Sequence, residues 1–217
     1  EVAFDAKDPW PVSADGAGHS LVLARPSFGE DDPRAWAASA KVGGSPGKVD
    51  PITPNPWAGV VINEFLAHTD DPVKDFIELH NASNRAVDLS GCVLTDNIAT
   101  NKYRFPPGSS LPARGFLALD QDQLGFSLSA AGETVWLVGS DGSRVVDAVR
   151  FGGQENGVSS GRAPDGSPTI RRLATPTQGA RNSAWKQEAV VLNEIMYHPI
   201  ANDDDQYVEL HNPSPEA

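Results

Sequence analysis

The sequence contains a single cysteine, Cys92, and no apolar run long enough to cross a bilayer. One cysteine cannot form a disulfide within the chain, so packing and hydrogen bonds must stabilise the fold. A membrane-spanning helix needs about 20 consecutive apolar residues, and no membrane insertion is therefore expected. Basic residues are also scarce, since 17 Lys and Arg stand against 29 Asp and Glu, giving a formal net charge of −12. Nucleic acid, which requires a basic surface, is not an expected partner.

Proline and glycine, by contrast, are frequent, with 18 and 20 residues spread between short apolar runs. No apolar pattern keeps a helical period for long, which predicts an all-β fold. Thr134–Val138 and Val145–Phe151 read as two strands that flank Gly139–Arg144. Because Asp141-Gly142 suits residues with positive φ, we predict an antiparallel hairpin closed by a type I′ turn.

Two segments of the chain occur twice. Val60–Phe65 reappears as Val190–Ile195, and Asp75–Asn81 reappears as Gln206–Asn212, with the spacing changed by one residue. Matched segments at nearly constant spacing indicate tandem repeats of about one domain length, roughly 130 residues.

The repeats and the linkers predict the domain organisation. Residues 1–52 are interpreted as the closing part of a preceding repeat, 53–56 as a proline-rich linker and 57–187 as one complete domain. Residues 188–217 then form the opening strands of a following repeat. Pro176–Asn182 is predicted to be a second linker. The chain begins at Glu1 without an initiator Met or a signal segment, so we expect it to be an internal piece of a larger protein.

Several ordered motifs carry a family resemblance. They are Val61-Ile62-Asn63-Glu64, Phe76-Ile77-Glu78-Leu79-His80-Asn81, Val87-Asp88-Leu89-Ser90-Gly91, Thr95-Asp96, Phe105-Pro106 and Gly115-Phe116-Leu117. This region resembles the lamin tail domain, in the tandem-repeat version found in large secreted or surface proteins of bacteria. The resemblance implies an immunoglobulin-like antiparallel β-sandwich with a binding or scaffolding role at the cell surface or outside the cell. Cys92 departs from the pattern, since the family usually has Trp there, and neighbours must fill the core volume.

The repeated polar residues have a structural interpretation. They are Asn63, Glu64, Glu78 and Asn81 in the first copy, and Asn193, Glu194, Glu209 and Asn212 in the second. Such carboxylates and amides beside apolar strand positions can hold loop N–H groups that would otherwise be unpaired. General acid–base work by a carboxylate pair needs a cleft and a shifted pKa. We therefore expect no catalytic residues.

Metal and cofactor sites are weakly indicated. His68 and His80 stand near Asp70, Asp71 and Asp75, but zinc requires three or four convergent ligands, and surface or hydrogen-bonded histidines explain the pattern equally well. Calcium is considered only for an acidic cluster made up of Asp203, Asp204 and Asp205. A solvated loop is the preferred interpretation of that cluster, and no cofactor is expected.

Two further motifs match short patterns without the required context. Gly157–Gly161 fits the G-x-S-x-G pattern of a hydrolase, yet Pro164 and the Asp165-Gly166 turn follow where a helix should begin. Asn81-Ala82-Ser83 is a glycosylation sequon, but Pro213 abolishes it in the second copy.

Three functions follow as alternatives. The preferred one is a non-catalytic extracellular structural, adhesion or spacer module of a larger bacterial protein. Its expected partners are a protein or glycan ligand, and neighbouring repeats of the same chain or of another copy. The others are an accessory binding domain for a kinase- or hydrolase-type enzyme elsewhere in the parent chain, and a surface array stiffened by calcium.

Overall fold

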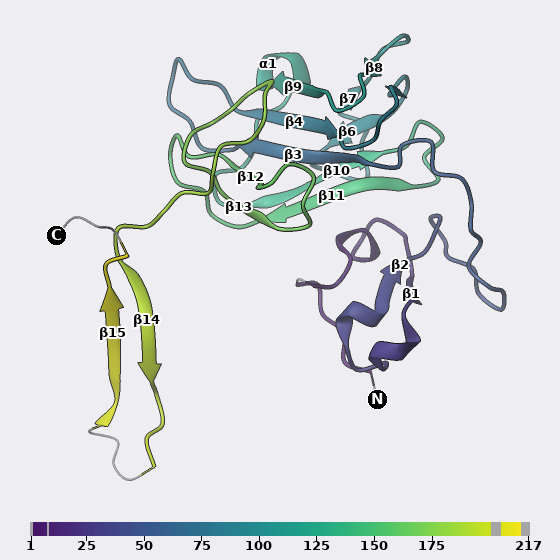
Figure 1. Ribbon diagram of the computed structural model, residues 1–217. Helices are drawn as coiled ribbons and strands as arrows, with labels where there is room; N and C mark the ends of the chain where they lie inside the picture. Colours follow the sequence, from purple (N-terminus) through teal and green to yellow (C-terminus); the bar gives the residue numbers. More distant parts are fainter. Residues whose placement is uncertain (1, 8, 201–204, 214–217) are drawn as a thin grey trace.

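The computed structural model describes residues 2–7, 9–200 and 205–213. Short antiparallel strands make up most of its regular structure, which confirms the all-β class with antiparallel sheets. Figure 1 shows a central body, a small N-terminal unit below it and a hairpin near the C-terminus that projects away from it. In the described ranges no helix is both long and apolar enough to cross a membrane.

Two antiparallel sheets form the central body (Figure 1). The five-stranded sheet has the order β13-β12-β3-β4-β9, and the four-stranded sheet has the order β11-β10-β6-β7. The strands of the first sheet are β3 (Val60–Leu66), β4 (Phe76–Asn81), β9 (Phe116–Asp120), β12 (Ser160–Arg162) and β13 (Ile170–Arg172). Those of the second are β6 (Val93–Thr95), β7 (Tyr103–Arg104), β10 (Glu133–Val138) and β11 (Val145–Phe151). A separate ribbon pairs β5 (Val87–Asp88) with β8 (Ser110–Leu111), and α1 (Gln121–Leu124) follows β9.

Apolar side chains from both sheets meet in one core. β4 is buried along its whole length, and β3 is buried at every residue except Val61. The largest fully buried side chains include Phe65 and Ile77 from the first sheet and Leu94 and Leu137 from the second. Each such side chain contributes about 1.5–3 kcal/mol by leaving water. Two layers packed on one core are consistent with an immunoglobulin-like sandwich.

The predicted hairpin of β10 and β11 forms, but its turn differs from the expectation. The two strands pair antiparallel from Glu133↔Phe151 to Val138↔Val145, with a register shift near the turn. A type I′ turn needs positive φ at both central residues. Gly142 has φ 67, whereas Asp141 is not among the described residues with positive φ. The prediction of a type I′ turn was therefore wrong, because Gly142 alone in the six-residue loop lies in the left-handed region.

The N-terminal unit, defined here as residues 2–7 and 9–50, is a small two-stranded body. Its elements are η1 (Val12–Ala14), β1 (Leu21–Leu23), η2 (Pro26–Phe28), η3 (Pro33–Ala35) and β2 (Trp36–Ala38). β1 pairs antiparallel with β2, and the rings of Trp10 and Trp36 lie 6.4 Å apart. Residues 51–59, which include the predicted linker 53–56, belong to no helix or strand.

The C-terminal hairpin consists of β14 (Val191–Met196) and β15 (Tyr207–His211), which pair only with each other among the described strands. Its apolar residues other than Val191 are exposed, in contrast to the buried matching residues of β3 and β4. Figure 1 shows the hairpin extending away from both sheets.

Candidate functional site

A β-bulge brings three polar residues to one face of the five-stranded sheet. Ile62 pairs with Leu79 and Glu64 pairs with Glu78, so Asn63 is the extra residue between them. A bulge inserts one residue into one strand and re-aims the side chains around it. Asn63, Glu64 and Glu78 are all 0% exposed, although each carries a polar side chain. Their burial requires partners, and a later part of the chain supplies them.

Residues 163–169 and 173–182, which flank β13 and are together called the covering segment, lie over these three side chains. Thr177 donates to Glu64 from its backbone N, at 3.0 Å, and from its Oγ1, at 2.8 Å. The backbone N of Gly179 donates to Glu78 Oε2 at 2.6 Å, and that of Gly166 donates to Asn63 Oδ1 at 3.1 Å. Each of the three side chains thus receives an N–H or O–H of the covering segment, and Glu78 Oε1 accepts from Asn63 Nδ2.

The covering segment corrects one prediction. Pro176–Asn182 was predicted to be a linker because it contains proline and glycine, yet it is fastened to the sheet. Asn182 Nδ2 donates to the backbone oxygens of Asn63 and Arg162, at 3.0 and 2.8 Å. Asn182 N also donates to Asp165 Oδ1 at 2.9 Å. Irregular backbone of this kind forms part of the fold when buried acceptors bind it.

Burial makes the contribution of Glu78 to stability depend on pH. Desolvation raises the pKa of its carboxyl to about 7, and the nearby charges of Glu64 and Asp165 act in the same direction, although Asn63 and Gly179 donate to it. A folded-state pKa above the unfolded value of about 4.5 means that the folded state holds this proton more tightly. The contribution to stability is complete below about pH 4.5 and is lost as the pH rises through about 7.

We expect Glu78→Gln to remove this pH dependence. In the wild type, the Glu78 contribution to the free energy of unfolding should fall by roughly 1–3 kcal/mol between pH 4.5 and 7.5. Urea titrations across this range should show a smaller slope in the variant, whatever its mean stability. Glu209→Gln, which changes the exposed counterpart, is the matched control and should keep the wild-type slope because Glu78 is still present. Equal slopes for the wild type and Glu78→Gln would contradict the assignment.

A second polar pair, formed by the buried Arg162 and the partly exposed Asp147, links the two sheets. Asp147 of β11 accepts from the backbone N of Ile62 at 2.7 Å, and Arg162 of β12 donates to Asp147 Oδ2 at 3.0 Å. Arg162 Nε also donates to the backbone oxygen of Ile62 at 2.8 Å, so the ion pair satisfies both backbone groups of that residue. Burial raises the pKa of Asp147, and the charge of Arg162 opposes this effect. The pair thus binds the backbone of Ile62 where the pairing of β12 with β3 has ended, one step beyond Gly161↔Glu64.

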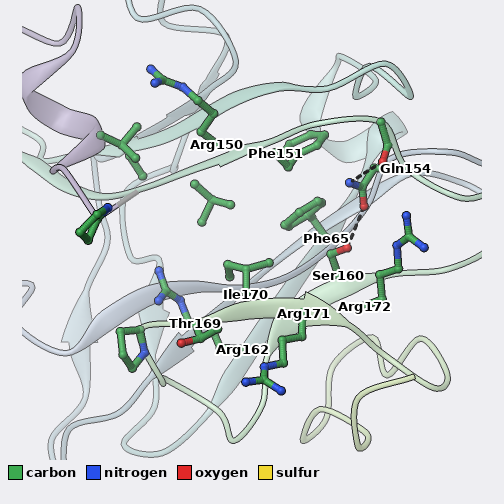
Figure 2. Close-up of a pocket in the computed structure, with 16 residues that line it drawn as sticks. Phe65, Arg150, Phe151, Gln154, Ser160, Arg162, Thr169, Ile170, Arg171 and Arg172 are labelled. Carbon is green, nitrogen blue, oxygen red and sulfur yellow. Dashed lines mark hydrogen bonds between the residues drawn. The ribbon is translucent and has the colours of Figure 1, made fainter. Parts of the chain in front are cut away.

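A groove of about 690 Å³ lies beside this pair, between β11 and the strands β12 and β13. Figure 2 shows the rings of Phe65 and Phe151 next to each other within it, and their centroids are 4.3 Å apart. Four arginines line it, at positions 150, 162, 171 and 172. Arg150 also contacts the N-terminal unit, because it donates to Asp15 and to the backbone oxygen of Ala6. An apolar floor with basic sides suits a ligand that is partly apolar and carries acidic groups.

The histidines and aspartates singled out in the sequence do not come together as a ligand set. His68 Nδ1 lies 2.8 Å from the backbone oxygen of Gln154, and His80 Nδ1 lies 3.1 Å from that of Gly115. Asp75 instead accepts from Leu128 N and Thr69 Oγ1. Across the described ranges, no group of three or more His, Cys, Asp or Glu side chains could hold a metal ion. Asp203 and Asp204 lie outside the described residues, so the calcium cluster is represented there by Asp205 alone.

The residues of the remaining short motifs are buried in the fold. Ser159, the serine of the G-x-S-x-G match, is 0% exposed and precedes β12, so no strand–turn–helix surrounds it. Asn81 is equally buried, and its Nδ2 donates to the backbone oxygens of Arg85, Leu111 and Pro112. A glycan on this nitrogen would break those bonds. Cys92 is also buried in the core, and burial raises the pKa of its thiol to about 11.

The second copy of the polar residues lies in the exposed hairpin. Asn193 Nδ2 donates to Glu209, as Asn63 Nδ2 donates to Glu78 at 3.2 Å. Glu194 accepts from the hydroxyl of Tyr207 at 2.6 Å. No covering segment lies over these residues in the described chain, so the hairpin carries half of the arrangement seen in the central body.

Comparison with known proteins gives one family. A family model, described as the Lamin Tail Domain, matches residues 53–153, while no curated protein and no solved structure matches the chain. The matched range contains Asn63, Glu64 and Glu78 but ends before the covering segment. The family is non-enzymatic and immunoglobulin-like, which is consistent with the antiparallel sheets and with a chain that is not an enzyme. Over residues 53–153, the chain is therefore similar to the Lamin Tail Domain family.

Proposed function

We propose that this chain is a non-catalytic spacer or adhesion module, in which successive units are docked on one another instead of being joined by free linkers. The observation that carries the proposal is the contact between the N-terminal unit and β11. His19 Nε2 accepts from Val145 N at 3.0 Å, and Val42 N donates to the backbone oxygen of Ser143 at 2.8 Å. Docked units hold a fixed direction, which is what a spacer requires.

His19 is well suited to this contact. It is buried, and its Nδ1 lies 2.8 Å from the backbone oxygen of Ser39. If Nδ1 donates to Ser39, then Nε2 is unprotonated and free to accept from Val145. Arg150 of β11 adds two hydrogen bonds, one to the backbone oxygen of Ala6 and one to the carboxylate of Asp15. Backbone and side-chain bonds together span the N-terminal unit and the edge of the sandwich.

The buried carboxylates support a non-catalytic role. Glu64 and Glu78 are held by N–H and O–H donors of the covering segment, so they are engaged in the fold, and neither lines the groove of Figure 2. The groove of Figure 2 is the surface to which we assign contact with a protein or glycan ligand. The extracellular or cell-surface location, which follows from the family resemblance, is part of the same proposal.

We expect the double variant His19→Ala/Arg150→Ala to release the N-terminal unit. NMR relaxation should give one rotational correlation time for both units in the wild type and two different times in the variant. Arg34→Ala is the matched control, since Arg34 pairs with Asp32 inside the N-terminal unit, away from β11. Independent tumbling of the two units in the wild type would overturn the proposal.

A further inference from the structure

A pocket of about 430 Å³ lies on the face of the five-stranded sheet that is turned away from the core. It is lined by His80, Arg114, Phe116, Pro164, Asp165 and Arg181. Leu79 points into the core, so its neighbour His80 points to the opposite face. His80 of β4 and Phe116 of β9 are strand partners, and their rings stack with centroids 4.4 Å apart. All the lining residues belong to the central body, and none of them lines the groove of Figure 2.

Arg114 has a backbone conformation that arginine rarely adopts. Among the described residues it is the one non-glycine residue with positive φ, 57. The turn before β9 holds it there, because Arg114 N donates to Ser83 O at 3.2 Å and Gly115 O accepts from Asn81 N at 3.0 Å. Glycine would fill this position without the steric strain that a side chain brings. The side chain of Arg114, which lines the pocket, gives a reason for an arginine at this position.

Two guanidinium groups at the pocket are available to a ligand. Arg114 has no side-chain hydrogen bond or ion pair with any described residue. The side chain of Arg181 is 88% exposed, and its Nε lies 3.9 Å from Asp165 Oδ2, too far for a hydrogen bond. The formal net charge of the chain is −12, so two such arginines at one pocket differ from the charge around them. Their planar donor groups match a carboxylate.

The same pocket also contains two acceptors that lack a donor. His80 Nδ1 lies 3.1 Å from Gly115 O, and because a carbonyl cannot donate, Nδ1 carries the proton of the neutral ring. Nε2 is then an acceptor, and no group within residues 2–7, 9–200 and 205–213 donates to it. Asp165 Oδ1 accepts from Asn63 and Asn182, but Oδ2 receives no hydrogen bond within the same ranges. A ligand in this pocket must therefore donate hydrogen bonds as well as accept them.

A second pocket, of about 390 Å³, adjoins the first. Pro164, Asp165 and Arg181 line both pockets, and Trp185 lines only the second. The Trp185 side chain is among the exposed large apolar groups, with 43% of the residue accessible. Both volumes fall within the range of about 300–1,000 Å³ that is usual for small-ligand sites. The two pockets together can therefore hold two connected rings of a ligand.

Trp185 is held in place by the central body. Its backbone forms an antiparallel bridge with Leu173, and Lys186 N donates to Arg172 O at 2.8 Å. Arg171, which does not line the second pocket, lies over the indole ring, 4.1 Å from its centroid. This cation–π contact fixes the ring orientation. The fixed ring offers a flat apolar surface and an indole N–H to a ligand.

These groups together define the chemistry of the ligand. The guanidinium groups require an anion, whereas His80 Nε2 and Asp165 Oδ2 require hydroxyl donors. The aromatic rings of Phe116 and Trp185 require apolar faces of similar size. A sugar acid supplies all three, through its carboxylate, its hydroxyls and the C–H faces of its pyranose ring. The carboxylate side chains of an acidic peptide only accept, so they leave both acceptors of the pocket without a donor.

We propose that the double pocket binds an oligosaccharide that contains uronic acid units. The carboxylate of one unit binds Arg114 and Arg181, and the hydroxyls of that unit donate to His80 Nε2 and Asp165 Oδ2. The adjoining unit packs on Trp185. This site is additional to the groove of Figure 2, and the inference does not rest on the spacer function.

NMR titration of the full chain with trigalacturonic acid tests the site. The amides of Gly166 and Arg181 and the indole N–H of Trp185 should shift, and binding should saturate below about 10 mM, a weak affinity. Arg181→Gln should weaken binding about tenfold or more, since it removes hydrogen bonds to a charged group. Arg104→Gln removes the same charge from β7, outside both pockets, and should bind like the wild type.

Arg114→Gly separates binding from folding. The variant should lose affinity for trigalacturonic acid about tenfold or more, because one guanidinium is removed. Its Tm should equal or exceed that of the wild type, because glycine adopts positive φ without strain. If Arg114 served only the fold, the variant would instead show a lower Tm and an unchanged affinity.

Two control ligands test the assigned chemistry. Galactotriose of the same linkage has the hydroxyls without the carboxylates, and triaspartate has carboxylates without the hydroxyls. Each should bind about tenfold or more weakly than trigalacturonic acid. The proposal is overturned by the absence of saturation with trigalacturonic acid, by equal binding of either control ligand, or by wild-type affinity in Arg114→Gly or Arg181→Gln. Equal binding of triaspartate would assign the pocket to acidic peptides instead.

Discussion

Arg162→Met should lower the free energy of unfolding by about 2–4 kcal/mol, somewhat less than the cost of breaking a fully buried ion pair, because Asp147 keeps a little solvent contact. The substitution removes the donor to Asp147 and the donor to the backbone oxygen of Ile62, while methionine retains much of the apolar volume. Urea denaturation at neutral pH is the measurement. Because burial raises the pKa of Asp147, acidic pH should restore part of the loss in the variant by neutralising that carboxyl.

The matched control for this prediction is Arg172→Met, on the neighbouring strand β13. Arg172 is half exposed, and its nearest carboxylates, Glu155 and Glu188, lie 3.7 Å away. Exposed pairs contribute about 0–1 kcal/mol, so the control should change little. If Arg162→Met and Arg172→Met had equal effects, Arg162 would not join the two sheets as described.

Asn63→Ala should lower the free energy of unfolding by about 2–4 kcal/mol. Hydrogen bonds to charged groups contribute about 1.5–3 kcal/mol each, and the truncation removes several of them. The amide donates to Glu78 and to Asp165, at 3.2 and 3.1 Å, and accepts from Gly166 N. Its loss leaves two carboxylates short of a donor inside a buried cluster. Chemical denaturation should show the loss, and proteolysis should show faster cleavage within the covering segment.

The chain provides its own control for Asn63. Asn193 occupies the same bulge in the C-terminal hairpin and donates to Glu209, but both side chains are exposed. Asn193→Ala should therefore change the unfolding of the central body by less than about 0.5 kcal/mol. A comparable loss for both variants would mean that burial does not set the strength of this arrangement.

Strand positions could be predicted from the sequence where their signal is local. The repeated segment Val60–Phe65 lies on β3, and Asp75–Asn81 covers β4 and the residue before it. The hairpin of β10 and β11 was expected at the observed residues. The predicted turn type was wrong because Asp141-Gly142 was assumed to form a two-residue turn. In a six-residue loop the register shift near Val138 changes which residue needs positive φ.

Contacts between residues that are distant in the sequence were harder to predict. Pro176–Asn182 has the composition of a linker, and its partners Asn63 and Glu64 are separated from it by more than a hundred residues. A single sequence gives no sign that these groups meet. Asp147 did leave a signal, as an acidic residue among the apolar residues of its strand, but the sequence alone does not indicate that Arg162 is its partner.

Amide hydrogen exchange tests most directly the central claim, that the repeated polar residues fasten the covering segment to the sheet. The amides of Thr177 and Gly179, which donate to Glu64 and Glu78, should exchange as slowly as those of the buried strands β3 and β4. Asn63→Ala should speed their exchange while leaving that of β10 unchanged. Exchange of both amides at the rate of an unstructured chain in the wild type would contradict the account.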